Sequence, residues 1–458
     1  TIAGHSLGHY LMACGLIHAQ TGDAECKKRT EYIVDELAEC QKVAGDGYIA
    51  GFTRKKGDLT EDGRVIFAEM EANDIRSAGF NLNGCWVPFY NWHKLFSGLF
   101  AAQTHCGNEK ALDVAKSLGD FIDKFFAKIN DEQLQKILNC EHGGINESLA
   151  ELYARTNEKR FLDLSIRIRH QKTLGPMFEQ KDALPGIHAN TQIPKVIGLA
   201  RLYELTKKEE YATAARYFWA NVTNNYTYVI GGNSDREYFQ SPNSISKYIT
   251  EQTCESCNTY NMLKLTRHLF EWNPNSAYFD YYERAHFNHM LAHQNPRSGA
   301  FAYMIPLMSW MAREWSSETN DFWCCVGSGM ETHSKHGESI YWKADKHLLV
   351  NLFIPSMLNW QEQNAEIELT TEYPKSDEIS LSVNKIGKSA DFKVSLRIPF
   401  WADNASLKIN GKNAKFAKEN GYATIQRKWK KGDTVALKLP MKLRFEATDN
   451  NQNNSDIN

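Results

Sequence analysis

The sequence predicts a mainly helical protein that ends in a β domain. We expect an (α/α)6 helical barrel over residues 1–340 and an antiparallel β-sandwich over residues 341–448. Two observations predict this class. A helical phrase recurs along the first two thirds of the chain, and the hydrophobic period changes to two after about residue 340. The Asn-rich residues 449–458 predict a disordered tail.

The repeat is clearest in Leu149–Thr156 (LAELYART) and Leu199–Thr206 (LARLYELT), which lie 50 residues apart. Looser copies occupy Leu11–Thr21, Gly98–Thr104 and Leu263–Phe270. Each copy is an apolar helix, a short polar turn and a second helix. Helical hairpins repeated in this way form an open solenoid or a closed toroid. The closed barrel is favoured, because the motif-bearing segments lie between paired helices and would meet at its mouth.

Seven segments of the last quarter alternate apolar and polar residues as half-buried strands do. They are Lys346–Ile354, Ala365–Thr371, Glu378–Val383, Phe392–Ile398, Ser406–Ile409, Tyr422–Arg427 and Thr434–Leu439. Asn410-Gly411 follows one of them and is a strong hairpin signal, because both residues tolerate a positive φ. These segments predict the antiparallel sandwich.

Composition narrows the class of partner. The 458 residues hold 53 Lys and Arg against 55 Asp and Glu, a formal net charge of -2, which does not favour nucleic acid or an acidic membrane surface. No apolar run reaches the length of about 18 residues that a transmembrane helix needs. Aromatic residues make up 12% of the chain, and their flat rings suit sugars. The chain opens at Thr1 without a signal-peptide pattern, so we interpret it as a fragment or processed form.

Three cysteines and a glutamate are the strongest chemical signal. Cys324 and Cys325 are adjacent, and Glu255 and Cys257 lie upstream, so three thiols and a carboxylate could close around one metal ion. The pattern Cys254-x-x-Cys257 offers an alternative, a structural zinc site of four thiolates. Taken singly, each cysteine could also be a small core residue. The other six cysteines are scattered and indicate no disulfide framework.

Four segments resemble glycoside hydrolase families 127 and 146, the zinc-dependent β-L-arabinofuranosidases. They are Gly4–Leu11 (GHSLGHYL), Gly231–Phe239, Glu255–Cys257 and Cys324–Glu331 (CCVGSGME). The opening motif and the Cys-Cys-Val-Gly phrase favour family 146, and by comparison the chain is short at both ends. The resemblance implies a retaining glycosidase that removes β-L-arabinofuranosyl residues from plant-type glycans.

The resemblance also implies roles for particular residues. Cys324 would be the nucleophile and Glu237 the general acid/base, although a solvated loop acid is the ordinary interpretation of such a glutamate. Zinc would be held by Glu255, Cys257, Cys324 and Cys325, with Cys254 only a neighbour. Zinc keeps a coordinating thiol deprotonated, which a free cysteine at neutral pH is not. The positions that resemble the family's sugar contacts are His93, His142, His188 and Tyr303.

Three alternatives stay open at this point. His5 and His9 have the i, i+4 spacing of a metal site, although packing or sugar contact is preferred. A helical toroid also hosts lyases and inverting glycosidases, in which Glu237 would pair with one other carboxylate, from Glu141, Glu147 or Glu331. A glycan-binding protein without activity would hold zinc structurally and unfold when the metal is removed.

Overall fold

The computed structural model describes residues 3–387 and 391–449, so the predicted tail lies outside the described residues except for Asp449. The chain forms two compact units. The first holds residues 1–268, 285–335 and 448–458, and the second holds residues 269–284 and 336–447. The predicted domain boundary between residues 340 and 341 stays a prediction.

Six helices form a closed ring within the part of the chain that the structure describes. In ring order they are α1 (His5–Thr21), α4 (Pro88–Cys106), α7 (Ile145–Thr156), α10 (Ile193–Thr206), α12 (Ser256–Trp272) and α14 (Cys324–His333). Helices α1 to α10 pack in this order, and α14 packs on α1. His268 of α12 lies 2.7 Å from Glu204 of α10. The thiol of Cys257 on α12 contacts the thiol of Cys325 on α14. The predicted closed barrel is therefore confirmed.

The second helix of each predicted hairpin follows its ring helix directly. These helices are α2 (Ala24–Ala44), α5 (Glu109–Phe126), α8 (Lys159–Arg167), α11 (Glu209–Asn225) and, in the second unit, α13 (Ser276–Ala285). Shorter helices are α3 (Val65–Glu71), α6 (Asp131–Ile137) and α9 (Gln171–Phe178). One small sheet pairs β1 (Thr53–Lys56) with β2 (Leu59–Asp62). A second has the order β3 (Ser77–Ala78), β4 (Asn81–Leu82), β5 (Cys85–Trp86), with β4 in the centre.

A left-handed residue ends four of the ring helices and starts the turn of the hairpin. It is Gly22 after α1, Gly107 after α4, Asn157 after α7 and Lys207 after α10, with φ of 75°, 68°, 57° and 56°. A residue in this conformation stops the helix and lets its amide bond back to the last turn. The repeat in the sequence is thus a repeat of this backbone turn.

Close approach of helices fixes the position of α1 between its two neighbours. A Cβ on Gly8 would lie 2.0 Å from the Lys94 carbonyl oxygen, and one on Gly98 would lie 2.5 Å from the Gly8 carbonyl oxygen. On the other side, a Cβ on Gly327 of α14 would lie 2.2 Å from the ring of His9. Only glycine permits these contacts, so α1 lies directly against the helix that begins with Cys324 and Cys325.

A large apolar cluster of the ring lies between the helices of the first hairpins. Phe67 and Trp92 stack at its centre with ring centroids 5.3 Å apart, and Ile49 accepts a hydrogen bond from the Trp92 indole at 2.8 Å. The cluster is separate from the small group that contains Cys257, Cys324 and Cys325. The three thiols are therefore not part of this large apolar cluster.

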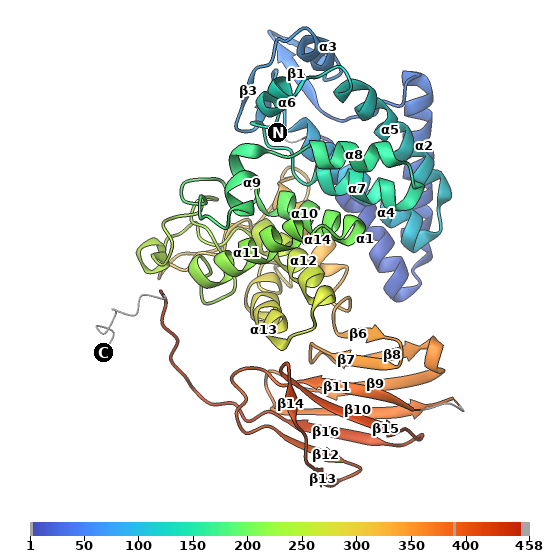
Figure 1. Cartoon of the computed structure of the whole chain (residues 1–458), viewed down its shortest axis with the longest axis vertical. Coiled ribbons are helices and arrows are strands. Elements are labelled where there is room, and N and C mark those ends of the chain that lie inside the picture. Colours follow the sequence, from blue (N-terminus) through green and yellow to red (C-terminus); the bar gives the residue numbers. More distant parts are fainter. Residues whose placement is uncertain (1–2, 388–390, 450–458) are drawn as a thin grey trace. The chain divides into compact units, whose positions relative to one another are not determined.

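The second unit is a β-sandwich of two sheets (Figure 1). One has the order β13-β12-β16-β10-β9-β8 and the other β14-β15-β11-β7-β6. The strands are β6 (Tyr341–Ala344), β7 (His347–Val350), β8 (Ser356–Trp360), β9 (Ala365–Thr371), β10 (Glu378–Lys385), β11 (Asp391–Arg397), β12 (Ser406–Ile409), β13 (Lys412–Ala414), β14 (Lys418–Glu419), β15 (Tyr422–Lys428) and β16 (Thr434–Lys438).

The expectation of a purely antiparallel sandwich needs one correction. Strands β7 and β11 pair in parallel, because the chain crosses to the other sheet through β8, β9 and β10 before it returns. Parallel neighbours need such a long connection, which alternation in the sequence does not reveal. The hairpin predicted at Asn410-Gly411 is confirmed: it joins β12 to β13, and both residues have a positive φ.

Candidate active site

Three loops and the start of α12 lie side by side at one end of the ring. Isolated bridges pair His188 with Tyr238, Asp235 with Thr253, and Glu255 with Met304. Each loop therefore holds the next in register, although their positions in the sequence span more than a hundred residues. As a result, three side chains meet: Glu237 from the loop that contains Asp235, Glu255 from the start of α12, and Tyr303 from the loop that contains Met304.

The thiols lie in the first turns of two helices. Cys257 follows the first residue of α12, and Cys324 and Cys325 are the first two residues of α14. The start of a helix carries a partial positive charge and unpaired amide hydrogens, which favour a thiolate over a thiol. The two helices thus bring their positive ends to one place.

Four potential ligand atoms gather there. The Sγ atoms of Cys257, Cys324 and Cys325 and one oxygen of Glu255 all lie within 4.8 Å of one another, and all four residues are buried. The Cys257 and Cys325 sulfurs are 3.2 Å apart, and Glu255 Oε1 lies 3.9 Å and 3.8 Å from Cys324 and Cys325. This group could hold a metal ion. Cys254 packs elsewhere, among Tyr228, Ala302 and Ile305.

The electrostatics of this group favour a cation. Burial raises the pKa of Glu255 and the pKa of the Cys257 and Cys325 thiols well above their usual values. Hydrogen bonds from those two thiols lower the pKa of Cys324 well below the usual value, which favours its thiolate form. The second carboxylate oxygen of Glu255 is buried without a hydrogen-bond partner. Three thiols and one carboxylate, of which one oxygen has no hydrogen-bond partner, form a set of ligands that fits a metal ion.

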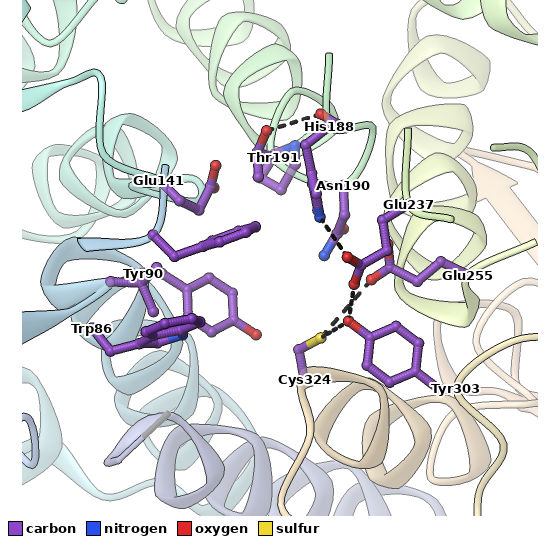
Figure 2. Close-up of a pocket in the computed structure, with 13 residues that line it drawn as sticks. Trp86, Tyr90, Glu141, His188, Asn190, Thr191, Glu237, Glu255, Tyr303 and Cys324 are labelled. Carbon is purple, nitrogen blue, oxygen red and sulfur yellow. Dashed lines mark hydrogen bonds and ion pairs between the residues drawn. The ribbon is translucent and has the colours of Figure 1, made fainter. Parts of the chain in front are cut away.

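A cavity of about 300 Å³ opens beside this group (Figure 2). Its lining residues are Phe80, Trp86, Val87, Tyr90, Glu141, His188, Asn190, Thr191, Pro194, Glu237, Glu255, Tyr303 and Cys324. The Tyr303 hydroxyl donates a hydrogen bond to Glu237 Oε1 and lies 3.6 Å from Cys324 Sγ. His188 Nε2 lies 3.5 Å from the other oxygen of Glu237. Glu237 and Cys324 therefore meet across one tyrosine hydroxyl.

The four predicted sugar contacts divide into two groups. His188 and Tyr303 line the cavity. His93 and His142 are buried and lie outside its lining: His93 Nδ1 accepts a hydrogen bond from the Gly144 amide at 3.0 Å, and His142 Nδ1 lies 3.1 Å from the Cys140 carbonyl oxygen. Sugar contact by these two histidines stays a prediction.

The three carboxylates considered as partners of Glu237 have different surroundings. Glu147 lies 2.5 Å from the Lys264 ammonium group and Glu331 lies 2.5 Å from His9, and neither lines the cavity. Glu141 does line it, and burial raises the pKa of its carboxyl group.

Neither histidine of the opening motif belongs to a group of three or more potential metal ligands in the described part of the chain. The rings of His5 and His9 meet edge to face with centroids 5.6 Å apart. Both are fully buried, and burial lowers the pKa of His5 to about 4. Packing, the preferred interpretation, accounts for His5.

Apart from Tyr303, the aromatic residues Phe80, Trp86 and Tyr90 of the lining were not predicted. Phe80 lies in the turn between β3 and β4, Trp86 ends β5, and Tyr90 lies in the first turn of α4. Their signal in the sequence is the run of aromatic residues just before a ring helix, which core packing explains equally well. Only the path of the three short strands brings the first two to the cavity.

Comparison with known proteins identifies the family. The profile described as "Beta-L-arabinofuranosidase, GH127 catalytic domain" matches residues 1–338, and that of the GH127 middle domain matches residues 347–441. The chain belongs to glycoside hydrolase family 127. It is therefore a glycosidase, and a glycan is its class of substrate. The predicted nearness to family 146 stays a prediction.

Relatives of this family 127 chain are distant in sequence. It is 24% identical to a non-reducing end β-L-arabinofuranosidase of Bifidobacterium longum, over 92% of this chain and 68% of that protein. A crystal structure of a family 127 β-L-arabinofuranosidase from Geobacillus stearothermophilus is 21% identical, with a TM-score of 0.74, and covers 96% of this chain and 72% of that one. A search of the described helices finds none that is long and apolar enough to cross a membrane.

Proposed function

We propose that this glycosidase removes terminal β-L-arabinofuranosyl residues from plant-type glycans with retention of configuration, using Cys324 as nucleophile and Glu237 as acid/base. One observation carries the proposal. The Tyr303 hydroxyl contacts both side chains, so a sulfur nucleophile and a carboxylic acid lie at one end of the same small cavity. The sugar is taken from the names of the relatives, which are arabinofuranosidases.

We infer that the metal is zinc. Three thiols and a carboxylate are a ligand set typical of this ion, which also tolerates the tetrahedral arrangement that two helix starts can supply. The ligands would be Glu255, Cys257, Cys324 and Cys325. When bound, zinc would keep the Cys324 thiol deprotonated at neutral pH. Glu255 supplies the one oxygen of the set, and its second oxygen has no other partner.

The reaction then follows from the two side chains. Cys324 Sγ attacks the anomeric carbon, the bond from that carbon to the leaving oxygen breaks, and Glu237 donates its proton to this oxygen. Glu237 next takes a proton from a water molecule, which attacks the same carbon and releases the sulfur. Two displacements restore the original configuration, and Glu237 returns to its protonated form.

The surroundings of Glu237 suit a group that changes protonation. Its side chain is 28% exposed and contacts one hydroxyl, from Tyr303, and one imidazole, from His188. The residue has a φ of 70°, which is uncommon for a side chain other than glycine and fixes the direction of the carboxyl group. A hydroxyl and an imidazole can each donate or accept a hydrogen bond, so they can contact either the carboxylic acid or the carboxylate.

A pair of carboxylates is the second candidate, because Glu141 lines the same cavity as Glu237. In such an enzyme the thiols would hold a metal for structure alone. The two candidates differ in what the sulfur of Cys324 does, so a substitution that replaces only this atom distinguishes them.

The test is hydrolysis of p-nitrophenyl β-L-arabinofuranoside by the wild type, Cys324→Ser and Cys254→Ser, with bound zinc measured in each. Cys254→Ser is the matched control, since Cys254 is also a buried cysteine but lies outside the group of potential ligands. We expect a loss of at least about a thousandfold in Cys324→Ser, comparable with the removal of other nucleophiles, and little change in the control. Full activity in Cys324→Ser would reject the thiol nucleophile and leave the carboxylate pair.

A further inference from the structure

A row of four aromatic rings runs along the cavity and out to solvent. Trp86 stacks on Phe80 with centroids 5.6 Å apart and an interplanar angle of 16°. Phe80 meets the His188 ring edge to face at 5.1 Å, and His188 meets Tyr238 in the same way at 5.4 Å. The two end members are exposed, Trp86 to 42% and Tyr238 to 41%. The row thus joins the interior of the cavity to the protein surface.

The position of Trp86 is fixed by the backbone on both sides. Trp86 pairs with Asn81 in the small sheet, and the next amide, of Val87, donates to the Phe80 carbonyl at 2.9 Å. The neighbouring Cys85 side chain is fully buried, so alternation along the strand directs Trp86 outwards. The large ring is therefore held in place, stacked on one face, and still exposed to solvent.

Depth in the cavity indicates where the leaving group must lie. Cys324 is 9% exposed and lies deep, whereas the side chain of Glu237 is 28% exposed. An acid protonates the leaving oxygen by direct contact, so the leaving group lies on the side of the sugar that faces solvent. Trp86 lies across the cavity from Cys324 and Glu237 in Figure 2.

The size of the cavity leads to the same conclusion. About 300 Å³ is at the small end of the range of about 300–1,000 Å³ for small-molecule pockets. A cavity at this small end holds one or two sugar rings and not a longer glycan, so the rings beyond the first must lie towards solvent. At the solvent side of the cavity, the exposed face of Trp86 is the flat apolar surface of the lining.

We propose that Trp86, supported by Phe80, is the subsite for the leaving-group sugar, the ring on the other side of the bond that is cleaved. The carbon-bound hydrogens on one face of a sugar ring pack well on an aromatic plane. Binding energy from this ring would orient the scissile bond towards Cys324 and Glu237. The inference rests on the proposed function, because it takes Glu237 as the acid.

The test compares two donors that share the same arabinofuranosyl group. β-L-Arabinofuranosyl fluoride has a leaving group too small to reach Trp86, and a disaccharide of two β-linked arabinofuranosyl units has a ring that reaches it. We expect the ratio of kcat/KM for the disaccharide to kcat/KM for the fluoride to fall about tenfold or more in Trp86→Ala, as for aromatic anchors at other binding sites. Because both kcat/KM values scale with the amount of active protein, their ratio does not change when a variant is partly inactive.

Two further variants sharpen the test. Trp86→Phe retains a flat ring and should recover most of the ratio. Trp310→Ala removes a tryptophan that is fully exposed and outside the lining, so its ratio should equal that of the wild type. An unchanged ratio in Trp86→Ala would overturn the subsite, and so would a wild type that cleaves the fluoride and not the disaccharide. A wild type that cleaves neither would instead reject the proposed function.

Discussion

His9 on α1 and Glu331 on α14 form a buried pair, with 2.5 Å between His9 Nδ1 and Glu331 Oε1. Tyr260 donates to the other carboxylate oxygen, and the charges of Lys94 and Lys335 add to the effect of His9. These partners lower the pKa of Glu331 to about 2, whereas burial lowers the pKa of His9. A neutral imidazole thus donates to a carboxylate anion, and this bond ties the helix of Cys324 to the first helix of the ring.

This pair gives stability that depends on pH. The pKa of Glu331 is lowered from 4.5 to about 2 in the folded protein, so the unfolded chain binds the proton more readily. The stabilisation is present above pH of about 4.5 and is lost as the pH falls through about 2. At neutral pH we expect Glu331→Gln to unfold more easily, by roughly 3 kcal/mol.

The measurement is urea unfolding of the wild type and of Glu331→Gln at several pH values between neutral and about 3. The gap between the two should narrow as the pH falls. Glu25→Gln, which removes an exposed helical ion pair with Arg29, should differ little from the wild type throughout. A gap that is constant with pH would show that the charge of Glu331 does not stabilise the fold.

Replacing the acid should affect substrates according to their leaving groups. In Glu237→Gln we expect kcat/KM for an unactivated arabinofuranosyl disaccharide to fall by about a hundredfold to ten-thousandfold, because the leaving oxygen is no longer protonated. Hydrolysis of the fluoride, which needs less help, should fall much less. Added azide should speed turnover by replacing the water that Glu237 would activate.

The control for this prediction is Glu251→Gln. Glu251 forms an ion pair with Arg236 beside the same loop, and its side chain is 35% exposed. Glu251→Gln should leave the relative rates of hydrolysis of the disaccharide and the fluoride unchanged. If Glu237→Gln lost activity equally on both substrates and did not respond to azide, Glu237 would be a positioning residue and another group would be the acid.

Removing the metal should abolish activity without unfolding the ring. The four proposed ligand residues lie apart from the apolar cluster of the barrel that contains Phe67 and Trp92. We expect a chelator to remove zinc with loss of hydrolysis, while far-ultraviolet circular dichroism keeps its helical signal. Zinc added back should restore activity and release protons, because thiols must be deprotonated to bind it. Loss of the helical signal on chelation would indicate a structural metal instead.

A buried arginine should dominate the stability of the second unit. The Arg397 side chain is fully buried; it lies 2.6 Å from Asp280 and also pairs with Glu283, and both partners lie on α13. Arg397→Met would leave two buried carboxylates without their cation, at a cost of about 3–5 kcal/mol. Thermal unfolding should show this loss, and Arg29→Met, at an exposed ion pair, should not. Adding Asp280→Asn and Glu283→Gln to Arg397→Met should recover part of it.

Local signals in the sequence predicted the fold well. Gly22, Gly107, Asn157 and Lys207 mark the same left-handed turn after successive helices, so the repeat could be found from the chain alone. Alternation predicted β9 and β12 at their observed limits. The parallel pairing of β7 with β11 could not be predicted, since alternation shows which residues face inwards and not which strand is the neighbour.

The candidate site divides in the same way. The Glu-x-Cys and Cys-Cys phrases are short and chemically unusual, so the sequence by itself predicted the cluster of one glutamate and three cysteines, the class of enzyme and the helical barrel. It did not determine that His93 and His142 lie outside the lining of the cavity, or that Phe80 and Trp86 lie within it. Those placements depend on how helices and short strands pack. A histidine or an aromatic residue is equally compatible with the core and with a cavity wall, and only the tertiary contacts decide between them.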